Sequence, residues 1–263
     1  MVCESNDHRF IYYDEKKAKN VKTFVAPHKR TDMKFSDFYK KTKQWKPGKP
    51  RLYLQQALND CIGPKIVKDF LQFNWDWANG QQKRNKWGDL TSNLLLVSQE
   101  GNITPTHYDE QENFLTQISG SKRAILFSPA HFQNLYPFPY FHPCDRQSQV
   151  DLENPDFIRF PRAAEVHPVE AILNPGDVLY IPPYWWHQIE SAIDGGPTIS
   201  LTFWYKCGPI EKIEYPLKGD QKVAITRNIE KMIMEAFNED TDEVTEFFRV
   251  ISLGRYVPLP TSK

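Results

Sequence analysis

The sequence predicts a mainly β protein with a barrel-like core, flanking helices and a C-terminal pair of helices. Residues 93–205 contain short apolar or alternating runs separated by turn residues, as is typical of strands. Two segments before this region and two after position 216 repeat apolar residues at helical spacing. We therefore expect a core domain over residues 1–215 and a helical segment over residues 216–263.

Two helices are expected before the strand-rich region. Residues 31–45 begin with Thr31 and Asp32, which are favourable capping residues, and are followed by Pro47 and Gly48, which end helices. Residues 64–79 carry apolar side chains at helical spacing.

Turn residues divide the strand-rich region. Gly120-Ser121 predicts a hairpin joining strands 113–119 and 122–127. A later turn, Asn174-Pro175-Gly176-Asp177, leads into a short apolar strand ahead of His187.

Two further segments have distinct patterns. Residues 198–205 alternate small polar with apolar side chains, so their polar face meets either a wet pocket or solvent. Residues 135–168 are rich in proline and aromatic side chains with little periodicity, which predicts a long functional loop.

The C-terminal segment predicts two amphipathic helices. Apolar side chains recur at helical spacing over 225–236 and again over 244–251. These helices either dock on the barrel or provide an interface between two copies of the chain.

Composition limits the class of protein. Apolar residues make up 40% and aromatic residues 14%, which is enough to fill a core. Lys+Arg and Asp+Glu each number 33, so no net charge favours nucleic acid or a membrane surface as partner. Four scattered cysteines favour a reducing compartment, and we expect a cytoplasmic and nuclear location with neither a signal peptide nor a membrane span.

The main chemical signal is a set of three metal-binding side chains. His107 and Asp109 are two positions apart, so on a strand they would share one face, and His187 would arrive from another strand. Two imidazoles and one carboxylate form the facial triad of non-haem iron(II) oxygenases. We therefore predict that these residues bind one divalent metal ion.

Polar residues near the triad are candidates for binding a cosubstrate. Lys122 shares a strand face with Ala124 and Leu126, where burial of its charge is costly unless an anion meets it. The alternative is that Lys122 extends into solvent from the start of the strand. Thr104 and Asn113 flank the triad and are able to donate hydrogen bonds. Asn113 would share the face of the triad only if the strand continued through residues 109–112.

Longer strings resemble a known family. They are Tyr-Tyr-Asp-Glu-Lys-Lys at 12–17, Leu-Tyr-Leu-Gln-Gln at 52–56, Leu-Thr-Ser-Asn-Leu-Leu-Leu at 90–96, His-Tyr-Asp-Glu-Gln at 107–111, Pro-Cys-Asp-Arg-Gln-Ser-Gln-Val-Asp at 143–151 and Trp-Trp-His at 185–187. From about Tyr12 to Tyr256 the chain resembles the Jumonji C oxygenases, most closely the asparaginyl hydroxylases known as factor inhibiting hypoxia-inducible factor. The resemblance implies a double-stranded β-helix core, the jelly-roll of cupin proteins.

The resemblance also implies roles for individual residues. His107, Asp109 and His187 would bind iron(II), which reacts with dioxygen and 2-oxoglutarate. The implied cosubstrate ligands are Lys122, Tyr53, Thr104 and Asn113, with Thr202 beside them. The implied substrate-binding residues are Tyr12, Arg146, Gln147 and Trp204.

The chain departs from the family pattern at two points. Thr202 stands where the family has asparagine, which would loosen the surroundings of the metal and cosubstrate. Residues 2–17 align with the interior of the family sequence, so a preceding family segment is expected to be missing.

We predict an enzyme that hydroxylates the β-carbon of asparagine. The resemblance implies ankyrin-repeat proteins and the transactivation segment of hypoxia-inducible factor as substrates, and a homodimer as the assembly. Two alternatives remain: another Jumonji C activity, such as lysine demethylation or hydroxylation of a different side chain, and a non-catalytic cupin that binds metal and ankyrin-repeat partners.

Overall fold

The computed structural model describes residues 1–58, 63–193, 195–209, 213 and 215–252. Its strands are β1 (Val2–Ser5), β2 (Lys29–Thr31), β3 (Arg51–Ala57), β4 (Leu90–Ser98), β5 (Ile103–Tyr108), β6 (Glu112–Ser119), β7 (Lys122–Phe127), β8 (Val169–Leu173), β9 (Val178–Ile181), β10 (Trp186–Ser191) and β11 (Thr198–Tyr205). Its helices are α1 (Glu15–Asn20), α2 (Phe35–Lys43), α4 (Pro64–Leu71), α5 (Trp75–Arg84), α6 (Gly219–Ala236) and α7 (Thr241–Ser252), with 3-10 turns at η1 (Pro129–His131) and η2 (Pro161–Glu165).

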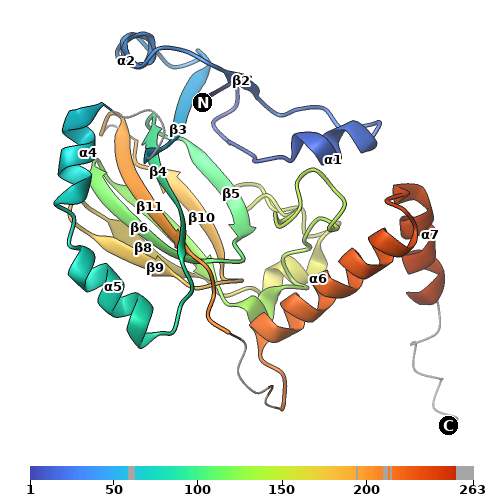
Figure 1. The fold of residues 1–263 in the computed structure, drawn as a ribbon. Coiled ribbons are helices and arrows are strands. Elements are labelled where there is room, and N and C mark those ends of the chain that lie inside the picture. Colours follow the sequence, from blue (N-terminus) through green and yellow to red (C-terminus); the bar gives the residue numbers. More distant parts are fainter. Residues whose placement is uncertain (59–62, 194, 210–212, 214, 253–263) are drawn as a thin grey trace, which may run out of the picture.

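Two antiparallel sheets form the core, and the predicted fold class is confirmed. The larger sheet has the order β2-β1-β3-β4-β11-β6-β9, and the smaller has the order β5-β10-β7-β8 (Figure 1). The main core cluster joins residues of both sheets, among them Tyr53 and Leu115 of the larger and Ala124 and Leu126 of the smaller. The two sheets therefore pack face to face, as in a jelly-roll.

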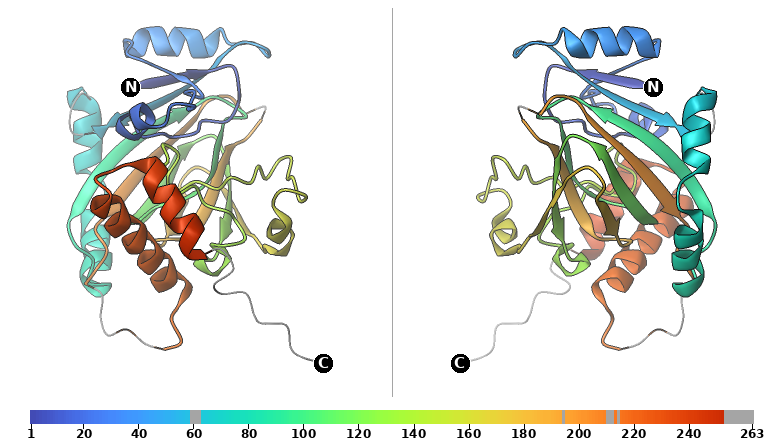
Figure 2. Two further views of the ribbon diagram at one scale, coloured as in Figure 1. Left: turned by 90° about the vertical axis from the view of Figure 1, so that its right-hand side faces the viewer. Right: turned by 90° about the vertical axis from the view of Figure 1, so that its left-hand side faces the viewer.

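Helices cover the outside of the larger sheet. Phe38 of α2 packs with Leu52, Leu54 and Val97. Phe203 of β11 stacks on rings from the α4–α5 region. Figure 2 shows these helices lying along the outer side of the sheet.

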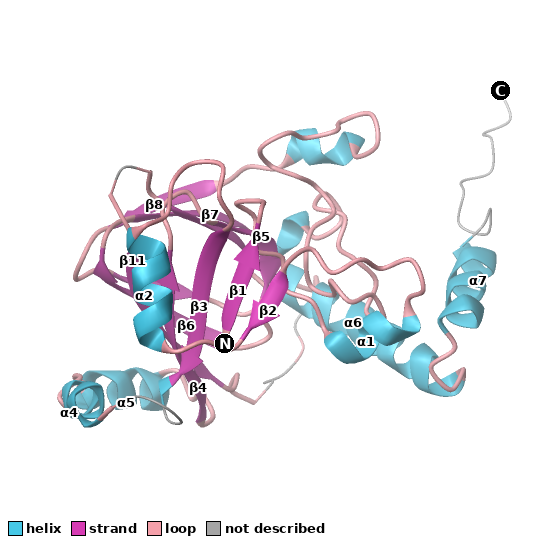
Figure 3. Cartoon of the chain, turned by 90° about the horizontal axis from the view of Figure 1, so that it is seen from above, coloured by secondary structure: helices cyan, strands magenta, loops and turns pink. Residues whose placement is uncertain are grey.

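The C-terminal helices lie at one end of the molecule. Val223 of α6 is buried with Tyr108 and Trp186, which attaches this helix to the smaller sheet. α7 packs on α6 through a contact between Phe247 and Phe237, and it projects away from the sheets (Figures 1 and 3). No helix among the described residues is long and apolar enough to cross a membrane.

The predicted N-terminal helices differ from the observed ones. The first begins at Phe35, because Thr31 instead pairs with Val2 in the β1–β2 ladder. The second is two helices, since Asn74 caps α5 by accepting a hydrogen bond from the Trp77 amide. The strand-rich region also starts earlier than predicted, with β1, β2 and β3.

The predicted hairpin at Gly120-Ser121 is wrong, although the turn is present. β6 pairs with β11 and β9, while β7 pairs with β10 and β8, so the turn carries the chain from one sheet to the other. A type I′ hairpin turn needs two successive residues with positive φ, and here Gly120 has φ +67 while Ser121 is not in that region. The Gln117 side chain holds the turn by donating to the carbonyls of Ser119 and Gly120.

Three other segments match their predictions. Residues 174–177 form a turn that precedes β9, and residues 135–168 form no strand and no helix beyond η2. In β11, Thr198, Ser200 and Thr202 are all buried, so this polar face meets the protein interior and not solvent.

Candidate metal and cosubstrate site

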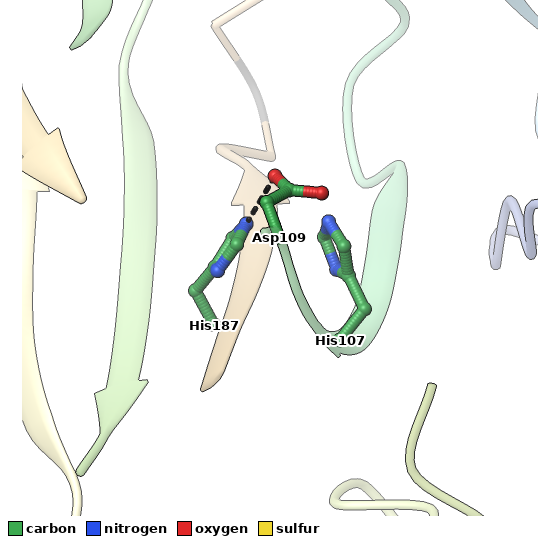
Figure 4. A group of neighbouring side chains, drawn as sticks. All are labelled: His107, Asp109 and His187. Atoms are coloured by element: carbon green, nitrogen blue, oxygen red, sulfur yellow. Dashed lines mark ion pairs between the residues drawn. The ribbon is translucent and has the colours of Figure 1, made fainter. Parts of the chain in front are cut away.

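The predicted triad comes together at the end of the smaller sheet. His107 of β5 lies directly opposite His187 of β10 in the antiparallel register, and their ring centroids are 4.1 Å apart. Asp109 lies just beyond the end of β5 and still turns toward the two rings (Figure 4). The three potential ligand atoms all lie within 4.8 Å of one another, so they are close enough to hold one ion.

Backbone hydrogen bonds orient both imidazoles. His107 Nδ1 lies 2.9 Å from the Pro105 carbonyl oxygen, and His187 Nδ1 lies 3.0 Å from that of Trp185. Because a carbonyl oxygen can only accept, Nδ1 carries the hydrogen and each Nε2 keeps its lone pair. The site therefore presents the unprotonated nitrogens that a metal needs.

Charge and burial favour the metal-binding protonation states. Burial and the neighbouring His187 lower the pKa of His107 to about 4. Burial opposes ionisation of Asp109, but the two histidines and Arg146 together hold the pKa of this carboxyl below its usual value. At neutral pH His107 is thus a neutral imidazole and Asp109 a carboxylate, and together with the His187 imidazole they form a donor set that fits iron(II).

All twelve residues predicted for the site line one cavity of about 440 Å³. They are Tyr12, Tyr53, Thr104, His107, Asp109, Asn113, Lys122, Arg146, Gln147, His187, Thr202 and Trp204. This volume is in the range of small-molecule sites. The structure thus places the predicted residues together, while their individual roles stay predictions.

Lys122 lies in the same sheet as the two histidines. Lys122 of β7 lies opposite Ser191 of β10. Ser191 is four positions after His187 on β10, so Lys122 and His187 are separated by roughly 13 Å along the strand direction. Its side chain is buried, and among the described residues no hydrogen bond or ion pair reaches it. Burial lowers the pKa of Lys122 to about 7. A buried cation without a counterion is suited to receive an anionic ligand.

The opposite wall also carries polar atoms without partners. Asn113 Oδ1, Thr202 Oγ1 and Trp204 Nε1 are buried and make no hydrogen bond in the described structure. Asn113 reaches the cavity from β6 of the larger sheet, because the strand carrying His107 ends before the polar residues 109–111. Such unpaired atoms are costly unless a ligand satisfies them.

Thr104 lines the cavity because of a bulge. Thr104 and His107 are three positions apart, which would place them on opposite faces of a regular strand. The pairing register of β5 with β10 shifts between Thr104 and His107, which indicates a β-bulge. Because of this bulge, Thr104 and His107 both face the cavity. The Tyr53 hydroxyl is also deeply buried, and burial raises the pKa of Tyr53 to about 12.

Arg146 and Gln147 lie at the cavity in the long loop. The Arg146 backbone has φ 68, and its Nη1 donates to Asp109 Oδ1 at 3.4 Å. Gln147 Nε2 donates to the Tyr12 carbonyl oxygen. The backbone of this loop pairs with β5, since the Tyr108 amide donates to the Arg146 carbonyl oxygen.

Sequence reasoning missed two parts of the site. Gln55 lines the cavity, and its Nε2 is buried without a partner. It lies two positions after Tyr53 on β3, so the strand period identifies it once Tyr53 is assigned. The second part is an ion-pair cluster around Arg227, for which the sequence carries no signal because its members lie far apart in the chain.

Comparison with known proteins agrees with this fold and site. Residues 4–209 match the family described as the cupin-like domain. The chain is 38% identical over 138 residues to "JmjC domain-containing protein D" of Dictyostelium discoideum, covering 52% of this chain and 30% of that protein. It is 32% identical over 173 residues to "Lysine-specific demethylase JMJ30" of Arabidopsis thaliana, covering 65% of this chain and 38% of that protein. It is 44% identical over 107 residues to "Lysine-specific demethylase 8" of Xenopus tropicalis, covering 40% of this chain and 23% of that protein.

These matches define the class of protein as a cupin-like domain, and its structure contains a candidate metal site of two histidines and a carboxylate. The chain belongs to the cupin-like domain family and, within it, to the Jumonji C superfamily. It spans less than half of the length of each of these three relatives.

Proposed function

We propose that this chain is an iron(II)- and 2-oxoglutarate-dependent oxygenase that hydroxylates the β-carbon of asparagine in protein substrates. The proposed substrates are ankyrin-repeat proteins and the transactivation segment of hypoxia-inducible factor. The observation that carries this proposal is the position of Arg146 and Gln147 at the cavity that contains the triad.

The residues of the triad fit the metal. His107, Asp109 and His187 would hold iron(II) through two imidazole nitrogens and one carboxylate oxygen. When bound, the iron would supply the redox chemistry between dioxygen, 2-oxoglutarate and a C–H bond, and the protein supplies positioning.

The protein's own residues would bind and orient 2-oxoglutarate. The Lys122 ammonium would pair with its distal carboxylate, and the ionic contact would in turn keep the lysine protonated. Tyr53, Thr104 and Asn113 line the same cavity as Lys122 and the triad and would donate hydrogen bonds. Apolar side chains such as Leu115 and Ile189 line the same space and exclude water.

The charge near the triad supports a neutral substrate side chain. The Arg146 guanidinium contacts Asp109, so a substrate group that reaches the metal passes close to a positive charge. The carboxamide of asparagine would accept a hydrogen bond from Arg146 and pair with the Gln147 amide. A methylated lysine would instead bring a like charge to the same place, at an energetic cost.

A second candidate function is lysine demethylation. Two of the relatives reported above are named lysine-specific demethylases, and they share the Jumonji C superfamily with this chain. The metal and cosubstrate residues would serve both reactions equally, so the discriminating feature is the substrate-binding loop at Arg146 and Gln147.

Mass spectrometry of peptides tests both candidates. The chain is incubated with iron(II), 2-oxoglutarate and air, and with either an asparagine-containing ankyrin-repeat peptide or a trimethyl-lysine peptide. We expect one added oxygen on the asparagine and no change in the lysine peptide. Loss of methyl groups instead would establish the second candidate. No change in either peptide and no release of succinate would favour a non-catalytic cupin.

Two variants sharpen this experiment. His107→Ala removes a metal ligand and should abolish oxygen transfer. Arg146→Ala should raise KM for the asparagine peptide. Arg159→Ala is the matched control, because this loop arginine stacks on Phe160 away from the cavity and should have no effect.

We further propose that the chain forms a homodimer through its C-terminal helices. Ile225, Ile229 and Met232 are exposed along one face of α6, where a second copy would bury them. Light scattering should give the mass of a dimer for the wild type and of a monomer for Ile229→Lys.

A further inference from the structure

One guanidinium on α6 contacts both the segment that carries Asp109 and the segment that carries Arg146. Arg227 is buried, with 3% of its surface exposed. It donates to Asp145 Oδ1 at 2.6 Å and Oδ2 at 3.1 Å, to Glu110 Oε1 at 2.9 Å and to the Tyr108 hydroxyl at 3.1 Å. Four hydrogen bonds to three side chains hold this group in one orientation.

Two of these partners flank the metal ligand Asp109. Tyr108 precedes it and Glu110 follows it, and both side chains bond to Arg227 on the side away from the metal. Asp109 itself lies past the end of β5, outside the strand pairing. Its carbonyl oxygen accepts a hydrogen bond from the Tyr184 amide. The anchored neighbours therefore hold the backbone on both sides of Asp109, whose carboxylate also contacts Arg146.

The third partner precedes the substrate-binding pair. Asp145 accepts from Arg227 with both oxygens and also receives Lys17 Nζ at 3.0 Å. The next residue, Arg146, has a positive φ. This backbone conformation is unfavourable for residues other than glycine, and it persists only where neighbouring contacts enforce it. The pairing of Asp145 with Arg227 is such a contact.

We propose that Arg227 is a positioning residue, which fixes Asp109 through Tyr108 and Glu110 and fixes Arg146 and Gln147 through Asp145. Through this one side chain, α6 is part of the site and not only a helix packed beside it. The role at Asp109 concerns metal binding alone, whereas the role at Arg146 and Gln147 rests on the proposed function.

The test measures binding and does not depend on turnover. Cobalt(II) affinity is measured by titration calorimetry, and affinity for the asparagine-containing ankyrin-repeat peptide by fluorescence anisotropy with manganese(II) and 2-oxoglutarate under nitrogen. Arg227→Lys keeps the charge but cannot reach both carboxylates. We expect its dissociation constant for cobalt(II) to rise about tenfold, in the range of residues that orient metal ligands, and its peptide affinity to fall as well.

Further variants separate the two routes. Glu110→Gln should weaken cobalt(II) binding and leave peptide affinity near the wild-type value, while Asp145→Asn should do the reverse. Combining Arg227→Lys with Glu110→Gln should weaken cobalt(II) binding no further than Arg227→Lys alone, because both act along one path. Arg249→Lys is the matched control, since Arg249 pairs with Glu246 on exposed α7 and should change neither affinity.

The outcomes decide the proposal even if Arg227→Lys does not fold, because Glu110→Gln and Asp145→Asn keep the guanidinium in place. Folded variants with lower melting temperatures but wild-type affinities for cobalt(II) and peptide would overturn it and leave Arg227 a stabilising residue only. If the wild type binds no peptide, the proposed substrate is wrong, and the cobalt(II) titrations still decide the role of Arg227 at Asp109.

Discussion

Replacing Lys122 with methionine should stabilise the ligand-free protein and at the same time abolish binding of 2-oxoglutarate. The lysine side chain is buried with no counterion among the described residues, and burial lowers its pKa from 10.5 to about 7. The buried Lys122 ammonium therefore destabilises the ligand-free protein, and a bound anion would offset this loss of stability. Methionine has a similar length and carries no charge.

The size of the effect follows from the pKa shift. A shift from 10.5 to about 7 is 3.5 units, which at about 1.36 kcal/mol per unit sets an upper limit of about 5 kcal/mol on the cost of the charge. Water in the cavity and imperfect packing of methionine reduce this value. We expect Lys122→Met to raise the free energy of unfolding by about 1–3 kcal/mol at pH 6.

The effect should depend on pH in a defined direction. Below the folded pKa of about 7, Lys122 is protonated in both the folded and the unfolded state, so the full cost is present. Between about 7 and 10.5 only the unfolded state holds the proton, so the stability of the wild type rises with pH in this range. The difference between variant and wild type should therefore shrink as pH rises above 7.

Urea denaturation at pH 6, 8 and 10, without ligand, measures this difference. Calorimetry with 2-oxoglutarate and manganese(II) measures cosubstrate binding, which should weaken more than about 100-fold, as expected when a buried ionic partner is removed. The exposed Lys49→Met variant is the control. A Lys122→Met protein that is less stable at pH 6, or that binds 2-oxoglutarate normally, would refute this reasoning.

Three more predictions concern the metal, the cavity wall and the sheet crossing. His107→Ala should lose metal binding, since one of three donors is removed, and metal analysis after dialysis checks this. Thr202→Asn should tighten 2-oxoglutarate binding by up to about tenfold, the value of one hydrogen bond, because Thr202 Oγ1 is unpaired; unchanged affinity in calorimetry would contradict it. Gln117→Leu should lower the free energy of unfolding by about 1–3 kcal/mol, since the buried Ser200 hydroxyl loses its acceptor and the turn loses two hydrogen bonds, and urea denaturation tests this.

Strand period and turn residues were sufficient to predict several elements. The alternation over 198–205 identifies β11, and the turn at 174–177 identifies the start of β9. Local patterns failed where distant segments compete for the same backbone. Thr31 looks like a helix cap, but it lies in β2 and pairs with Val2 of β1, a partner that its local sequence does not specify.

The sequence by itself indicated the candidate chemistry: a histidine and an aspartate at strand spacing with a second histidine far downstream, a lysine on an apolar face, and a mainly β core. Only the tertiary structure decided the arrangement. Gly120 carries the chain between the two sheets, a bulge turns Thr104 into the cavity, and Arg227 joins Tyr108, Glu110 and Asp145. The physical reason is that side-chain chemistry and strand period are local properties, whereas sheet pairing and buried ion pairs depend on which distant segments meet.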